Sequence, residues 1–160
     1  MQESIEPAIV SWGGWPDPED TWQTEFHWLG TRDPSALLSI SAAIEFMESV
    51  GLERFRERTH ALARYARQRI GELTGLEALT PDAPDWYGSM VSLPLPAGPG
   101  RPLQTAIWQR FRVEVPVFAW EGGRLVRPSC HLYTRREHVD RLVDALRELL
   151  PEFSRHECRG

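Results

Sequence analysis

The hydrophobic pattern of the chain changes its period at Gly75, and this change constrains the fold more than any other feature. Before this glycine, apolar residues recur every three or four positions over residues 33–50 and 52–73, which predicts two helices separated at Gly51. After it come short β-prone runs between loops rich in glycine and proline: "LEALTP", "SMVSLPLP", "VEVPVFAW" and "RLVRPS". The sequence therefore predicts a chain in which helices and strands are combined in one core.

Two more helical patterns complete the order of elements. "LQTAIWQRF" predicts a short helix, and residues 134–150 predict a last one, with Thr134 as its N-cap and Glu137 at N3 in a capping box. From Leu52 onwards the order is then α-β-β-α-β-β-α. Short turns between paired strands and one-sided helices predict an α/β chain whose α+β small domain is a small open sheet covered on one face.

The stretch "FHWLGTRDPSALLSI" marks the start of the first helix. Asp33 is a good N-cap, and Pro34 suits the first helical position. Gly30 and Thr31 come just before it, where free backbone N–H groups and the helix dipole favour an anion. The same pair is equally compatible with an ordinary cap, so the pattern leaves both interpretations open.

Composition and charge exclude several classes of protein. The chain has 160 residues, of which 41% are hydrophobic and 26% charged, as is typical of one globular domain. A net charge of −5 disfavours a nucleic-acid partner, and no apolar run reaches the roughly 20 residues that span a membrane. "MQESIEPAIV" lacks the features of a signal peptide, so we expect a cytoplasmic protein with Cys130 and Cys158 reduced. No spacing of possible ligands predicts a metal site.

All 18 basic residues of the chain are arginine, and none is lysine. A lysine amine is the group that forms Schiff bases with carbonyl compounds. These 160 residues cannot supply one from a side chain.

Two clusters have a functional and a structural interpretation. Four of the seven tryptophans lie in residues 1–29, where they form either an aromatic binding surface or, more often, packing area. Six arginines crowd the predicted helix 52–73. Their alternation with Glu53 and Glu57 favours a solvated face over a nucleic-acid surface.

The run "RLVRPSCH" holds the remaining candidate chemistry. Arg127, in the predicted returning strand, is either a bidentate carboxylate ligand or a surface arginine at a strand edge. Cys130 and His131 are adjacent, so on a strand they would face opposite sides and could not act as nucleophile and base. Cys130 is therefore expected to be a small core residue.

Two segments of the chain resemble a known family. "HWLGTRDPSALLSISAAIEFMESVG" is similar to the Gly-Thr-x-Asp segment and following helix of class V aminotransferase-like, pyridoxal-phosphate-dependent enzymes. "LVRPSCHLYTRREHVDRLVDALREL" is similar to the end of these enzymes, with Tyr133-Thr134 in place of the usual Tyr-Asn. The isopenicillin N epimerase-like branch matches best, from about Ile9 to Leu150.

This resemblance implies the C-terminal part of a fold-type I pyridoxal-phosphate enzyme that acts on an amino acid. Residues 1–50 would be the tail of the large cofactor domain, residues 51–150 the small domain and residues 151–160 a tail. By match, Gly30 and Thr31 would contact the cofactor phosphate of the neighbouring subunit of a homodimer, and Arg127 would bind the substrate carboxylate.

The resemblance also places the Schiff-base lysine upstream, in a domain that these residues do not include. Three hypotheses follow: an inactive remnant, one half of a split enzyme completed by a separate large-domain polypeptide, or a dimerisation or binding module without cofactor.

Overall fold

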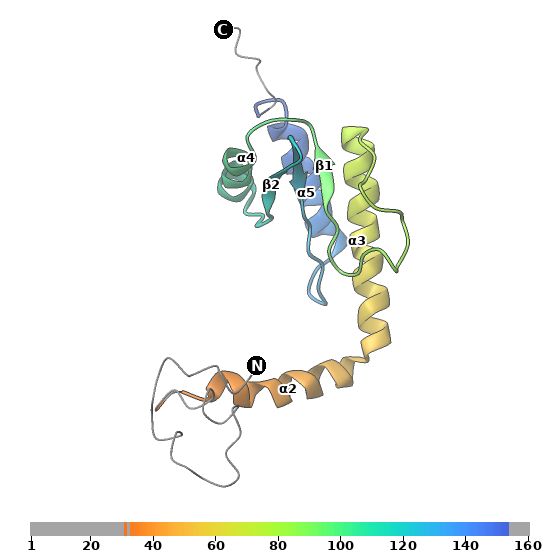
Figure 1. The fold of residues 1–160 in the computed structure, drawn as a ribbon, viewed down its shortest axis with the longest axis vertical. Helices are drawn as coiled ribbons and strands as arrows, with labels where there is room; N and C mark the ends of the chain where they lie inside the picture. The colour runs from red at the N-terminus through yellow and green to blue at the C-terminus, as the bar shows by residue number, and fades with distance from the viewer. Residues whose placement is uncertain (1–30, 32, 154–160) are drawn as a thin grey trace, which may run out of the picture. The chain divides into compact units, whose positions relative to one another are not determined.

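The structure is a computed structural model that describes Thr31 and residues 33–153 (Figure 1). The chain separates into two compact units, Met1–Ser49 and Val50–Gly160. In the first, Asp33 caps helix α2 (Ser35–Val50), because its Oδ1 accepts the backbone N–H of Ser35 at 2.9 Å and also the Ser35 hydroxyl. These two hydrogen bonds hold the pKa of the Asp33 carboxyl below its usual value. The capping role predicted for Asp33 is confirmed. The four tryptophans clustered in residues 1–29 lie outside the described residues.

Helix α3 (Leu52–Thr74) opens the second unit, begins where the sequence predicts and ends one residue later than predicted. It ends at Gly75, whose left-handed φ of 68° lets its N–H bond the carbonyl of Gly71 at 2.8 Å. A side chain would resist this conformation, which explains the stop. The predicted apolar stripe is buried at Leu62, Ala66 and Ile70.

Three antiparallel strands form the sheet, in the order β1-β3-β2. They are β1 (Leu93–Leu95), β2 (Val117–Trp120) and β3 (Gly123–Val126). In the register Leu93 and Val117 both lie opposite Val126, so these three side chains share one face. All three are buried in the core with residues of α3 and α5 (Arg136–Leu149). The sheet is small and open, as predicted.

The second unit departs from the prediction at three places. "LEALTP" forms no strand; Leu76 and Leu79 are exposed, 40% and 56%, so no second apolar face holds them in place. Helix α4 (Gly100–Ala106) begins three residues before the predicted "LQTAIWQRF", because Pro102 falls in the first turn, where its missing N–H costs nothing. The same helix continues as a π-helical turn, η3 (Ile107–Phe111).

The predicted capping box of the last helix is wrong by one residue. Helix α5 starts at Arg136, with Arg135 and not Thr134 at the N-cap. The Thr134 hydroxyl accepts the N–H of His131 at 2.9 Å, so it closes the preceding turn and is not free to cap. His138, not Glu137, is at N3, and its Nδ1 accepts the N–H of Arg135 at 3.4 Å.

No single helix among the described residues is both long and apolar enough to cross a bilayer. Helices α2 and α3 have the length and apolar composition of a membrane-spanning segment only when they are taken together across the break at Gly51.

Candidate functional site

Arg127 lies one residue beyond the end of β3, not within the strand as predicted. Pro128 follows it and has no N–H to continue the ladder, which is why the strand ends here. The backbone N–H of Arg127 donates to the carbonyl of Pro116 at 3.1 Å, and this bond extends the pairing of β3 beside β2 by one position. The backbone of Arg127 is thereby held by the sheet while its side chain is exposed.

The guanidinium of Arg127 lies over the ring of Phe118. Its carbon is 5.8 Å from the ring centroid of Phe118, which the register places on the opposite face from Val117. No hydrogen bond or ion pair with another described residue involves this guanidinium. An arginine with a fixed backbone, an aromatic support and a free planar fork can bind a carboxylate through two parallel hydrogen bonds.

Thr31 is exposed and lies ahead of the capped start of α2. The N–H of Ser35 is already bonded to Asp33, so this amide is not open to an external anion. A contact between the Thr31 hydroxyl and a phosphate stays a prediction. Gly30 lies outside the described residues.

Cys130 and His131 do not form a nucleophile and base. Cys130 is 3% exposed, and burial raises the pKa of its thiol, which keeps it protonated near neutral pH. The His131 ring lies between Phe55 and Tyr133, with centroid distances of 5.3 and 4.8 Å, which is a packing position. Cys130 belongs to the core, as the sequence predicts, whereas His131 is partly buried against the two rings.

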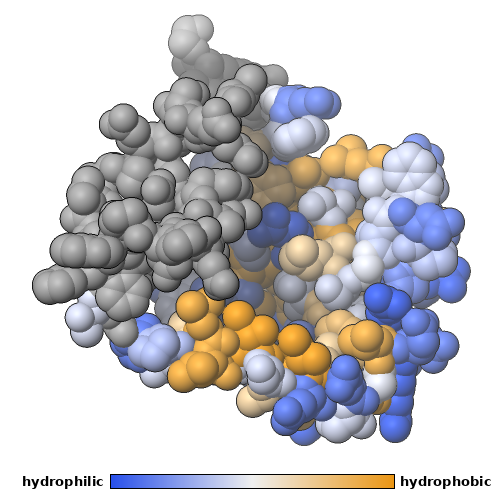
Figure 2. Space-filling view, turned by 60° about the horizontal axis from the view of Figure 1, so that its bottom comes forward, coloured by the Kyte–Doolittle hydropathy of each residue, from blue (hydrophilic) through white to orange (hydrophobic). Residues whose placement is uncertain are grey.

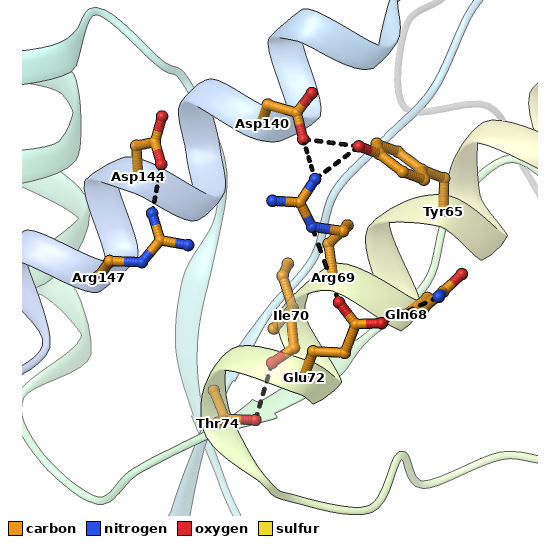
Figure 3. Close-up of polar contacts among 9 residues, drawn as sticks. All are labelled: Tyr65, Gln68, Arg69, Ile70, Glu72, Thr74, Asp140, Asp144 and Arg147. Atoms are coloured by element: carbon orange, nitrogen blue, oxygen red, sulfur yellow. Dashed lines mark hydrogen bonds and ion pairs between the residues drawn. The ribbon is translucent and has the colours of Figure 1, made fainter.

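Two polar networks join parts of the chain that the sequence pattern does not connect. The first, in Figure 3, joins α3 to α5: Tyr65 donates to Asp140 at 2.7 Å, and Arg69 donates to the oxygen atoms of both. The second holds the loop after α3, where Asp82 accepts hydrogen bonds from Tyr87 and Arg64. Partners 71 and 75 positions apart cannot be recognised from periodicity, and no local signal marks them.

Apolar side chains also gather on α2, where no residue is buried. Figure 2 shows apolar surface at its lower edge, where α2 comes forward. The most exposed are Leu37, Leu38, Ile40, Ile44 and Phe46. Contiguous apolar surface of this kind marks an interface.

The profile of the family Aminotransferase class-V matches residues 20–142, and the chain belongs to this family. It is similar to isopenicillin N epimerase of Amycolatopsis lactamdurans, 36% identical over 157 residues that cover 91% of this chain and 39% of the relative. The same enzyme of Streptomyces clavuligerus is 34% identical and covered to 41% of its length.

The fold agrees with the sequence prediction, which is the C-terminal part of a fold-type I pyridoxal-phosphate-dependent enzyme with a small open sheet. A cysteine desulfurase of Escherichia coli superposes with a TM-score of 0.68 at 16% identity, over 93% of this chain and 39% of that one. The apo cysteine desulfurase of Thermococcus onnurineus NA1 gives a TM-score of 0.66 at 19% identity, over 92% of this chain and 38% of that one. The chain thus spans about two fifths of the proteins it matches.

Proposed function

We propose that this chain is the C-terminal portion of a pyridoxal-phosphate-dependent enzyme that acts on an amino acid, and that Arg127 binds the substrate carboxylate. The observation that carries the proposal is the family match over residues 20–142, which includes both Thr31 and Arg127. The free guanidinium of Arg127 beside Phe118 supports it. The relatives include epimerases and proteins named as cysteine desulfurases or desulfhydrases, whose names all concern amino acids or compounds derived from them.

The residues present fit pyridoxal phosphate in part. An exposed threonine hydroxyl suits a phosphate, and Gly30 beside it would allow close approach of the backbone. The 160 residues hold no lysine, so they do not fit covalent attachment of the cofactor. When bound, the cofactor supplies an electron sink for reactions at the α-carbon. Arg127 would fix the substrate by its carboxylate, and Thr31 would hold the phosphate of the neighbouring subunit.

The lysine must then come from residues outside these 160, in a large cofactor domain. Residues 1–50 would complete that domain, residues 51–150 would form the small domain and residues 151–160 a tail. A homodimer or a separate large-domain polypeptide would supply the partner, and the assembled enzyme would work in the cytoplasm. A chain that stays without such a domain would be inactive, and the alternative function is then a dimerisation or binding module. The exposed apolar face of α2 favours this second candidate.

Co-expression tests the proposal. The chain would be produced with the part of the Amycolatopsis lactamdurans epimerase that lies outside the matched region, and copurification, retained cofactor and amino-acid binding would be measured. We expect a complex that retains pyridoxal phosphate, whereas the chain alone should give no borohydride-reducible adduct on a side chain. An adduct on a mapped side chain of the chain alone would contradict the lysine argument.

Two variants in that complex separate the site residues. Arg127→Lys should weaken amino-acid binding nearly as much as Arg127→Ala, roughly tenfold to a hundredfold, because lysine keeps the charge but lacks the planar fork. Both should leave cofactor retention unchanged. Thr31→Ala should weaken cofactor retention first and leave amino-acid binding less affected. If Arg127→Lys binds amino acids like the wild type, Arg127 is a structural residue of the strand end.

A further inference from the structure

A cavity of about 1160 Å³ lies in the second unit, between α3, the loop of residues 76–82 and β1. Neither Thr31 nor Arg127 lines it. Its lining carries three arginines and three acidic residues: Arg64, Arg67, Arg136, Glu72, Glu77 and Asp82. This volume is larger than the roughly 300–1,000 Å³ that is usual for small-molecule sites. Which of these charges are already paired decides what the cavity can bind.

Two of the three acidic residues, Asp82 and Glu72, already accept hydrogen bonds from other residues of the protein. Asp82 accepts the Tyr87 hydroxyl on one oxygen and Arg64 Nε, at 2.9 Å, on the other. Both bonds lower the pKa of Asp82, so its carboxylate stays charged and committed to the loop. Glu72 accepts Gln68 Nε2 at 2.9 Å and lies 3.9 Å from Arg69 Nε. These pairs turn both carboxylates towards neighbours on the protein.

Arg67 and Arg136 line the cavity without a hydrogen bond or ion pair to a described residue, and Glu77 is the carboxylate of the lining that is likewise unpaired. Arg136 lies over the ring of Tyr65, and Arg67 is the one of the two that lies near Asp82, whose pKa it helps to lower. The guanidinium carbon of Arg67 lies 5.8 Å from the ring centroid of Tyr87. One terminal nitrogen, Nη1, is buried without a partner. A buried donor left unbonded costs free energy, and this nitrogen has no surface open to a ligand, so the rest of the guanidinium is the part that a ligand could meet.

We propose that this cavity binds a small molecule through an oxyanion, carboxylate or phosphate, held by the guanidinium of Arg67. The planar fork of arginine matches both groups, and the Tyr87 ring fixes its orientation from behind. Arg64 stands beside it on α3, on the same side of the helix one turn earlier, and its bond to Asp82 leaves its terminal nitrogens free to donate. The cavity is open to solvent on the side of residues 76–82, where Leu76 and Leu79 are exposed. This inference is independent of cofactor use.

The full chain would be titrated with inorganic phosphate and, separately, with citrate, at constant ionic strength set by sodium chloride. Binding would be followed by calorimetry and by shifts of the backbone amide signals of residues 76–82. We expect saturable binding of at least one probe with shifts confined to this loop and α3. Tighter binding of phosphate would identify a phosphate ligand, and tighter binding of citrate a carboxylate ligand.

Arg67→Met keeps the aliphatic stem and removes the donors, so it should weaken binding of the preferred probe roughly tenfold or more. Arg56→Met is the matched control, because Arg56 lies on the same helix, exposed and paired with Glu53. It should bind like the wild type. Arg67→Lys covers the case in which Arg67→Met does not fold, and it should bind more weakly than the wild type. No saturable binding of either probe to the wild type, or unchanged affinity in a folded Arg67 variant, would overturn the proposal.

Discussion

At the scale of single residues, Tyr87 links the pH dependence of stability to the loop after α3. Burial and the hydrogen bond to Asp82 raise the pKa of Tyr87 to about 12, from 10.0. In the unfolded chain this tyrosine loses its proton near pH 10, whereas the folded protein keeps it to about pH 12. The unfolded state therefore binds fewer protons in this interval, and the free energy of unfolding falls as the pH rises.

We expect the urea midpoint of the wild type to decrease between pH 10 and 12, and Tyr87→Phe to lack most of this decrease. The chain has no lysine, so few other groups titrate there. Urea denaturation at several pH values measures the slope, and Tyr133→Phe is the control because Tyr133 is 76% exposed. Equal slopes for wild type and Tyr87→Phe would show that the Tyr87–Asp82 bond does not couple to folding.

At the scale of elements, the sequence predicts correctly those helices whose extent is set by an apolar repeat and by glycines at their ends. Helix α3 matches its predicted bounds to within one residue, because a repeat of 3.6 residues lies between Gly51 and Gly75, two residues with positive φ. The strand predicted at "LEALTP" is absent, since a short apolar run acquires strand structure only by pairing, and pairing depends on distant residues. For the candidate site, the pattern leaves two interpretations of Arg127 open, and the resemblance predicts that it binds a carboxylate. The cavity beside Arg67 could not be predicted, because its lining comes from α3, residues 76–82, β1 and α5.

The contact between α3 and α5 gives a prediction at this scale. Asp140 on α5 accepts from Tyr65 and Arg69 on α3, as Figure 3 shows, and all three side chains are partly shielded from water. Asp140→Asn removes a charge-assisted hydrogen bond, so it should lower the free energy of unfolding by about 1 kcal/mol. Asp144→Asn on the same helix should cost less than about 0.5 kcal/mol, because Asp144 pairs with Arg147 on the exposed surface. If urea denaturation gives the same loss of stability for both variants, the network between α3 and α5 contributes no more than the exposed ion pair.

At the scale of the whole molecule, the apolar face of α2 predicts association. Its side chains include Leu37 and Leu38, exposed to 69% and 72%. We expect the purified chain to self-associate, or to bind a partner, in a concentration-dependent way that sedimentation velocity measures. Leu38→Glu should reduce the association, whereas Leu79→Glu, in the loop after α3, should leave it unchanged. A monomer at all concentrations would contradict this expectation.

The burial of Arg124 in β3 has a consequence for proteolysis. Arg124 is 1% exposed, and its Nη1 donates to the carbonyls of Pro99 and Phe153, at 3.2 and 3.3 Å. Trypsin cuts only after arginine in a chain without lysine, and the Arg124–Leu125 bond lies in the central strand of the sheet. We expect cleavage there to follow the rise of the unfolded population with urea, and cleavage near native conditions would reveal local opening of the sheet. The rate of cleavage at this one peptide bond therefore reports how often the second unit unfolds.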